Sequence, residues 1–173
     1  IMPLGRGELI EGIDDSKKLK EGERARLAAL IRERAIAYAV CEEDNRTVDR
    51  INILEATRLC MKRAVESLVP GPDIVFTDGN FRLDISLPQQ NIIHGDALSY
   101  CIGAASILAK VYRDEEMKKF AEIYPQYGFE KHKGYGTKAH LDAIREYGLC
   151  EIHRRTFTKK FSAEREKNSP RDT

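Results

Sequence analysis

The sequence predicts an α/β fold, on three observations. Apolar runs of strand length alternate with longer stretches whose apolar residues recur every three or four positions, which is typical of a layered α/β domain. Pro and Gly separate these stretches into distinct elements. With 173 residues, of which 42% are hydrophobic and 33% charged, the chain has the composition of an ordinary globular domain. One domain is therefore expected over residues 1–161, with a polar, disordered tail over 162–173.

The first half of the chain predicts a helix, a short strand and a second helix. The first helix covers 21–37, and the apolar run at 38–41 predicts a strand. The second helix covers 47–68 and ends before a Val-Pro-Gly-Pro segment. The core stripe of the first helix is expected to be Leu27, Leu30, Ile31 and either Arg34 or Ala35. The buried side of the second is expected to be Ile51, Leu54, Leu59, Ala64, Val65 and Leu68.

The second half predicts two strands and two further helices. The strands end at Asp78 and at Gly95, each after a short apolar run. A long helix covers 98–120, and its small, apolar segment at 102–109 is expected to be buried. A short helix at 138–146 follows a loop that is rich in Gly, Tyr and Lys.

Two aspartates follow the predicted strands. Asp78 ends the first strand, and Asp96 comes directly after the second. A carboxylate at the end of a core strand is held by the scaffold at the edge of solvent, and two such carboxylates form a hard-oxygen site suited to Mg²⁺ or Mn²⁺. The alternative is that each aspartate only caps a turn, because Asp beside Gly is common in turns.

A basic segment near the C-terminus contrasts with the net charge of +1. Residues 131–160 hold eight basic and three acidic side chains, a local excess of five. Basic residues interleaved with aromatic ones are typical of nucleic-acid binding, although a Lys-rich segment is also common on a solvated face. The aromatic residues within or just before this segment are Tyr124, Tyr127, Phe129, Tyr135, Tyr147 and Phe157.

The cysteines argue against a disulfide framework and for a cytoplasmic location. The four of them are widely scattered and lie within apolar patterns, as expected in a reducing compartment. Cys150 and His153 have the spacing of a zinc half-site, but nothing nearby completes four ligands. No apolar run is long enough to cross a membrane.

Seven motifs stand out: DSKKL at 15–19, DRINIL at 49–54, DGN at 78–80, GDA at 95–97, AASILAKV at 104–111, HKGYGT at 132–137 and IHRRTF at 152–157. Their identity and order resemble ribonuclease HII over nearly the whole chain. The HKGYGT and IHRRTF motifs are similar to the bacterial type HII rather than to type HIII. The resemblance implies a ribonuclease H-like mixed sheet flanked by helices.

The chain departs from this family at its N-terminus. Ribonuclease HII opens with a strand that carries Asp-Glu-Ala-Gly-Arg-Gly, and neither that strand nor its acidic pair is found here. The Gly-Arg-Gly at 5–7 is not equivalent, because no acidic residue precedes it. We therefore expect an N-terminally truncated chain that lacks about two strands and is weakly active or inactive alone.

The resemblance implies an endoribonuclease. Such an enzyme cleaves the RNA strand of RNA–DNA hybrids and cuts 5′ of ribonucleotides embedded in duplex DNA, leaving 5′-phosphate and 3′-hydroxyl ends. It uses two Mg²⁺ or Mn²⁺ ions, with Asp78 and Asp96 as catalytic metal ligands in this chain. The expected form is a monomer that acts on nucleic acid without membrane association. Alternatives are a catalytically dead nucleic-acid-binding remnant of the same fold and a small-molecule phosphatase that uses the aspartate pair.

The resemblance also implies a set of nucleic-acid-binding residues. Tyr135 is expected to pack on the sugar beside the ribonucleotide, with a core tyrosine as the alternative. Lys17 is expected to approach the substrate backbone with Ser16 beside it, although a lysine in a polar turn is commonly only solvated. Phosphate contact or support of the site is also expected of Lys133, Lys110 and Asn80.

Overall fold

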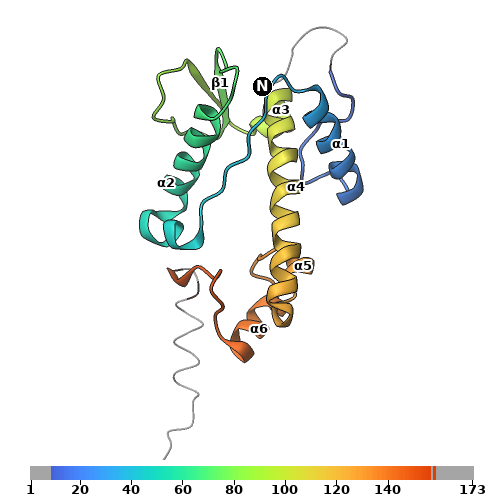
Figure 1. Ribbon diagram of the computed structural model, residues 1–173, viewed down its shortest axis with the longest axis vertical. Helices are drawn as coiled ribbons and strands as arrows, with labels where there is room; N and C mark the ends of the chain where they lie inside the picture. Colours follow the sequence, from blue (N-terminus) through green and yellow to red (C-terminus); the bar gives the residue numbers. More distant parts are fainter. Residues whose placement is uncertain (1–8, 157, 159–173) are drawn as a thin grey trace, which may run out of the picture. The chain divides into compact units, whose positions relative to one another are not determined.

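A computed structural model describes residues 9–156 and 158, and it confirms the α/β class (Figure 1). No helix in this part of the chain has the length and apolar character to cross a membrane. The predicted tail at 162–173 lies outside the described residues, so the expectation of a single domain over 1–161 stays a prediction. The elements are α1 (Glu21–Arg34), α2 (Asn45–Glu66), β1 (Val75–Asp78), β2 (Gln89–Ile92), α3 (Gly95–Leu98), α4 (Tyr100–Ile123), the 3₁₀ helix η1 (Pro125–Tyr127), α5 (Phe129–His132) and α6 (Lys138–Tyr147).

The chain divides into two compact units. The first unit consists of the residues up to Glu42 together with Thr57–Tyr112, and the second of Glu43–Ala56 together with the residues from Arg113 onward. Helices α2 and α4 each contribute residues to both units.

The core of the first unit lies between α1 and α4, which pack through small and branched side chains (Figure 1). Leu27 and Ile107 are fully enclosed, with 0% exposure each. The predicted stripe on α1 is confirmed for Leu27 and Ile31, and Leu30 and Ala35 pack against it half-buried. The remaining core residues are Ile10, Ala28, Ala104, Leu108 and Val111.

Strands β1 and β2 pair in parallel, with Val75 opposite Gln89 and Asp78 opposite Ile92. The connection between them is held by side-chain amides of β2. Gln89 accepts a hydrogen bond from Leu83 N at 2.8 Å and donates one to Leu83 O at 3.0 Å. Asn91 donates to Phe81 O. These bonds satisfy backbone groups of the connecting loop.

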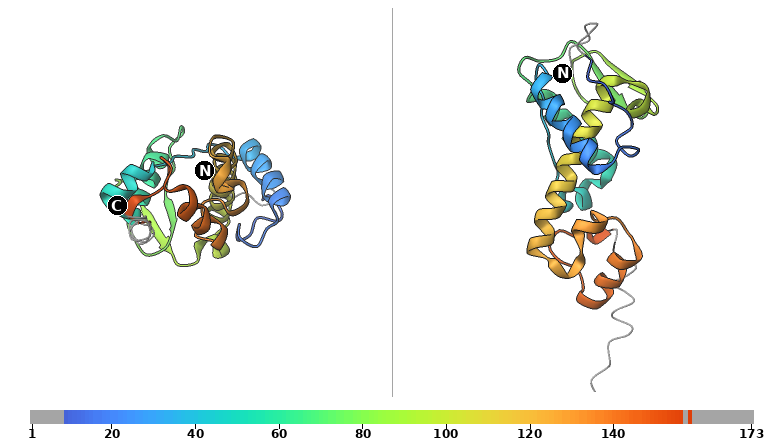
Figure 2. Two further views of the ribbon diagram at one scale, coloured as in Figure 1. Left: turned by 90° about the horizontal axis from the view of Figure 1, so that it is seen from below. Right: turned by 90° about the vertical axis from the view of Figure 1, so that its right-hand side faces the viewer.

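The second unit is built around Phe129, which is 1% exposed. Met117, Tyr127 and Ile144 pack with it in one cluster. Tyr127 stacks on the Phe129 ring at 5.4 Å. Figure 2 shows η1, α5 and α6 gathered beside the C-terminal part of α4. The predicted helix at 138–146 is confirmed as α6, and Thr137 Oγ1 caps it by accepting from His140 N at 3.4 Å.

Three details of the elements predicted between 38 and 68 are wrong. The segment 38–41 is not a strand, because among the described residues no strand pairs with it, and the Cys41 carbonyl accepts from the Cys60 thiol at 2.9 Å instead. The predicted helix at 47–68 is kinked at Asn52 (φ 68°). Its predicted buried residue Leu54 is 48% exposed, because the kink changes which positions face the core.

The segment 102–109 is only partly buried, contrary to expectation. Ile102, Ala104, Ile107 and Leu108 face the core, whereas Ala105 and its neighbour one turn on, Ala109, are exposed. Within the part of the chain that the structure describes, this helix therefore buries one side and leaves small residues of the other side exposed.

Candidate active site

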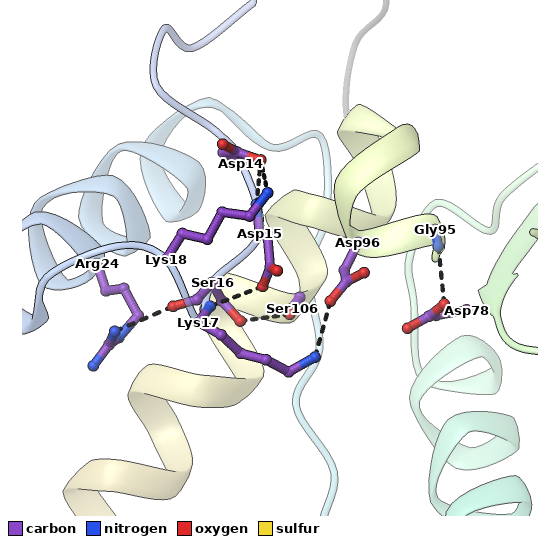
Figure 3. A network of polar contacts seen from close by, with 10 residues as sticks. All are labelled: Asp14, Asp15, Ser16, Lys17, Lys18, Arg24, Asp78, Gly95, Asp96 and Ser106. Atoms are coloured by element: carbon purple, nitrogen blue, oxygen red, sulfur yellow. Dashed lines mark hydrogen bonds and ion pairs between the residues drawn. The ribbon is translucent and has the colours of Figure 1, made fainter. Parts of the chain in front are cut away.

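Asp78 is the last residue of β1, and its carboxylate is turned toward the start of α3 (Figure 3). Oδ1 accepts a hydrogen bond from the Gly95 backbone N–H at 2.9 Å. Gly95 permits this approach because it has no side chain: a β-carbon there would lie 2.5 Å from Ile102 Cδ1 and 3.5 Å from Asp78 Cα. The predicted strand end at Gly95 is wrong, because β2 ends at Ile92 and Gly95 begins α3.

Replacing Gly95 by Ala is expected to destabilise the first unit by roughly 1–3 kcal/mol, the usual range for overpacking a well-filled site. The added methyl group would push Ile102, which is 7% exposed, out of its place in the core. The midpoint of thermal unfolding measures the effect.

Gly22→Ala is the matched control for that substitution. Nothing lies within 4 Å of the position of its β-carbon, and Gly22 lies in the first turn of α1. Ala favours a helix over Gly by up to about 1 kcal/mol, so this variant should keep or raise the midpoint. Equal midpoints for the two variants would contradict the close packing at Gly95.

Asp96 follows Gly95 as the second residue of α3, and it pairs with Lys17. Lys17 Nζ donates to Asp96 Oδ2 at 3.2 Å. The Lys17 side chain is 77% exposed, and the Asp96 side chain is 12% exposed. The hydrogen bond and the charge of Asp96 raise the pKa of Lys17, with smaller contributions from the charges of Asp15 and Asp78. The structure thus brings Lys17, Asp78 and Asp96 together at the start of α3 (Figure 3).

The turn that carries Lys17 is anchored to the body of the first unit (Figure 3). Lys17 N donates to Asp15 Oδ1 at 2.9 Å, which closes the turn locally. The Ser16 hydroxyl bonds to the Ser106 hydroxyl of α4 at 2.8 Å, and Ser16 O accepts from Arg24 at 3.1 Å. Ser16 is 3% exposed, so its hydroxyl is directed toward α4.

The second unit carries Tyr135 on an exposed loop. The tyrosine is 66% exposed and follows two residues in left-handed conformations, Lys133 (φ 51°) and Gly134 (φ 80°). Its backbone is held on both sides, because Tyr135 N donates to His132 O at 2.8 Å and His140 Nδ1 donates to Tyr135 O at 2.9 Å. The alternative of a core tyrosine is excluded by this exposure.

The remaining predicted residues are placed separately. Asn80 is exposed in the turn after β1, and Lys110 is half-buried on α4. Among the described residues, Asn80 forms no hydrogen bond with Asp78 or Asp96. Lys133 Nζ donates to Glu130 O at 2.6 Å.

Comparison with known proteins gives the family. The sequence model of ribonuclease HII matches residues 9–160. Ribonuclease HII of Pelodictyon phaeoclathratiforme is 49% identical over 152 residues, which are 87% of this chain and 74% of that protein. Ribonuclease HII of Caldicellulosiruptor saccharolyticus is 51% identical over 156 residues, which are 90% of this chain and 76% of that protein. The chain belongs to the ribonuclease HII family. The predicted resemblance is confirmed, as is the prediction of a hydrolase by family.

Solved structures share the ribonuclease HII fold. Ribonuclease H2 from Pyrococcus horikoshii superposes with a TM-score of 0.77 at 24% identity, covering 91% of this chain and 83% of that one. The ribonuclease HII in a PCNA complex from Archaeoglobus fulgidus superposes with a TM-score of 0.66 at 22% identity, covering 85% of this chain and 78% of that one. The predicted ribonuclease H-like fold is confirmed by this likeness.

The donor set at the start of α3 fits a hard divalent cation. Both side chains are carboxylates, which Mg²⁺ and Mn²⁺ prefer over nitrogen or sulfur ligands. Within the described residues, Asp78 Oδ2 and Asp96 Oδ1 form no hydrogen bond. That part of the chain holds no group of three or more His, Cys, Asp or Glu arranged for a metal.

Sequence reasoning missed that three histidines of the second unit form one cluster. The cluster consists of His132, His140 and His153, and all three are buried. The ring of His140 bonds to that of His153. The rings of His132 and His140 bond to the backbone of the loop that carries Tyr135. Only Cys150 and His153 were considered from the sequence, as a zinc half-site. The sequence did contain one indication of the cluster. Three of the four histidines lie within 132–153, on both sides of the Gly-Tyr-Gly segment at 134–136.

Proposed function

We propose that this protein is an endoribonuclease that hydrolyses the RNA strand of RNA–DNA hybrids and cuts 5′ of ribonucleotides embedded in duplex DNA. The products would be 5′-phosphate and 3′-hydroxyl ends. One observation supports the proposal most. Asp78 bonds to the first residue of α3 and Asp96 is the second residue of that helix, in a chain of the ribonuclease HII family. The partner is therefore a nucleic acid that contains ribonucleotides.

Asp78 and Asp96 would hold the divalent cations. Because Mg²⁺ sites commonly combine one or two carboxylates with water and substrate phosphate oxygens, two acidic side chains are a sufficient start for such a site. When bound, Mg²⁺ or Mn²⁺ lowers the pKa of the attacking water and stabilises the charge on the leaving 3′-oxygen, with two ions sharing these tasks. Asp78 is oriented for this role by its bond to Gly95 N.

Lys17 would contact a substrate phosphate beside the metal ligands. Its ammonium is largely exposed and lies 3.2 Å from Asp96 Oδ2, so a phosphate there would meet both a fixed positive charge and the cation. Ser16 supports this role indirectly, because its hydroxyl bonds to Ser106 and anchors the turn. Asn80, Lys110 and Lys133 are proposed as further contacts to the nucleic-acid backbone.

Tyr135 would test the sugar at the ribonucleotide. An exposed aromatic ring packs well on a ribose face, while hydrogen bonds read the 2′-hydroxyl. The left-handed conformations of Lys133 and Gly134 present the ring from a tight loop rather than from a helix side.

A second candidate is a nucleic-acid-binding remnant of the fold without catalysis. It is favoured by the small acidic set, because the described residues contain no group of three or more His, Cys, Asp or Glu that could hold a metal ion. With two acidic ligands we expect weak cation binding and slow turnover by this chain.

Incubation of the purified chain with a DNA duplex that contains one ribonucleotide tests the proposal. We expect slow cleavage 5′ of the ribonucleotide with Mn²⁺ or Mg²⁺, none with a chelator and none on an all-DNA duplex of the same sequence. Cleavage that persists in chelator, or that ignores the ribonucleotide, would contradict the proposal. Binding that prefers the ribonucleotide duplex without any cleavage would favour the remnant.

A further inference from the structure

Three of the four histidines form one buried cluster in the second unit. Their exposed fractions are 9% for His132, 6% for His140 and 7% for His153. The rings of His132 and His140 stack at 4.3 Å between centroids, and that of His153 lies 5.2 Å from His140. Phe129 closes the cluster, with edge contacts to His132 and His140 at 5.8 and 5.4 Å.

The hydrogen-bond partners of His140 and His153 decide which nitrogen carries the proton. A carbonyl oxygen only accepts, so the 2.9 Å contact between His140 Nδ1 and Tyr135 O requires a proton on Nδ1. His140 Nε2 lies 3.0 Å from His153 Nε2, so in the neutral ring it accepts and His153 Nε2 donates. His153 Nδ1 then accepts from the Cys150 N–H at 2.9 Å, with the Cys150 thiol at 3.0 Å.

His132 is fixed in the same way. Its Nε2 donates to Tyr127 O at 2.7 Å, again because a carbonyl accepts. Its Nδ1 accepts from the Gly134 backbone N–H at 3.2 Å. Each of the three rings therefore uses one nitrogen as donor and one as acceptor, which only an uncharged imidazole does. Two of the rings bond directly to the backbone of the loop that presents Tyr135.

The surroundings favour the uncharged rings. Burial lowers the pKa of His153 to about 4, and burial also lowers the pKa of His140. Among the described residues, no carboxylate hydrogen-bonds to any of the three rings. Titratable groups in their surroundings include the Tyr127 phenol, which donates to Gly148 O, the Cys150 thiol, and the Arg113 guanidinium beside Gly134.

We propose that His132, His140 and His153 are positioning residues that hold the 134–135 backbone, and with it the Tyr135 ring, through one uncharged hydrogen-bonded network with a single set of tautomers. The proton sits on Nδ1 of His140 and on Nε2 of His132 and His153. The network sets how well the protein distinguishes ribonucleotide from deoxyribonucleotide. This last step rests on the proposed role of Tyr135 in sugar recognition.

The tautomers are tested directly, without any variant, by long-range ¹H–¹⁵N NMR of the histidine rings in the intact chain at pH 7. The expected result is three uncharged rings from the cluster, of which one is protonated on Nδ1 and two on Nε2. The signals are assigned with single His→Gln variants. A charged ring in the cluster, or a His140 protonated on Nε2, would overturn the proposal.

The functional step is tested with two variants of His140 that differ in the bond they keep. The amide of Asn reaches the position of imidazole Nδ1, so His140→Asn keeps the donor to Tyr135 O. The amide of Gln reaches the position of Nε2, so His140→Gln loses that donor and keeps the contact with His153. The measurement is the ratio of the dissociation constants for an all-DNA duplex and for the same duplex with one ribonucleotide, with Ca²⁺ as the cation.

We expect His140→Gln to reduce this ratio about fivefold, the effect of losing one backbone-anchoring hydrogen bond, while His140→Asn retains it within about twofold. In a Tyr135→Ala background the two substitutions should give the same ratio, because the network acts through Tyr135. Equal ratios for the two variants with Tyr135 present would overturn the inference. If Tyr135→Ala alone leaves the ratio unchanged, the proposed function of Tyr135 fails instead, and the NMR result still stands or falls by itself.

Discussion

Asp96→Asn and Asp78→Asn are each expected to weaken Mn²⁺ binding at least tenfold and to reduce metal-dependent cleavage at least a hundredfold, because each removes one of two acidic ligands and even supporting residues of metal sites contribute that much. The stability of the fold should change little. The Lys17–Asp96 pair joins a largely exposed ammonium group to its partner, and such pairs contribute about 0–1 kcal/mol. Titration with Mn²⁺, followed by water-proton relaxation, measures binding apart from activity.

Asp84→Asn is the matched control in the same unit. Asp84 also pairs with a lysine, Lys62, at 2.7 Å, but its side chain is 93% exposed and it belongs to the loop before β2. The control should keep the Mn²⁺ affinity of the parent chain. If Asp84→Asn and Asp96→Asn lowered the affinity alike, the cation would be held by general surface charge rather than by the aspartates at α3.

The position of Asp78 was predictable, whereas the surroundings of Asp96 were not. An apolar run followed by Asp-Gly is a local pattern, and it correctly marks the end of β1. The short helix α3 depends on His94 in a left-handed conformation (φ 57°) and on the approach of Gly95 to Asp78 from 17 residues away. No local pattern encodes a contact of that kind, so the sequence placed the strand end three residues too late.

The helical period was reliable where a helix packs along one face and misleading where the backbone departs from a helix. The stripe on α1 appears in the core as predicted. At Asn52 the side-chain oxygen accepts from the backbone of Leu54 and Glu55 at 2.9 and 3.1 Å, which starts a new helical segment with a different phase. Leu54 is exposed for that reason, although its spacing matched the buried side.

The histidine network could not be predicted, because its bonds join residues through space and through their protonation. His140 and His153 are 13 residues apart on segments without a common period. The sequence showed only that His153 follows Cys150 at a metal-like spacing, and the structure gives that pair another use, since the Cys150 N–H and thiol point at His153 Nδ1.

Lowering the pH from 7 to 4 is expected to destabilise the second unit through this network. The pKa of His153 in the unfolded chain is 6.5. At pH values above 6.5, His153 is uncharged in both the folded and the unfolded chain, so its titration does not affect the stability. Below 6.5 the unfolded chain binds a proton that the native state does not take up until about pH 4, so the free energy of unfolding falls across this window and levels off below it. For His153 alone the loss reaches about 3 kcal/mol at pH 4, and His140, whose pKa burial also lowers, adds to it.

Urea unfolding followed by tyrosine fluorescence at several pH values measures this loss, because Tyr127 stacks on Phe129 inside the cluster. Some aspartates also have lowered pKa values, and their effect on stability falls in a separate, more acidic window. An example is Asp49, whose carboxylate accepts bonds from Arg155 N and Thr156 N. Its contribution to stability is lost only at pH values below its unfolded pKa of 3.8. His153→Gln keeps a donor toward His140 but does not titrate, so its stability should depend much less on pH between 4 and 6.5. An unchanged pH dependence in this variant would show that acid acts on the unit elsewhere than at the buried histidines.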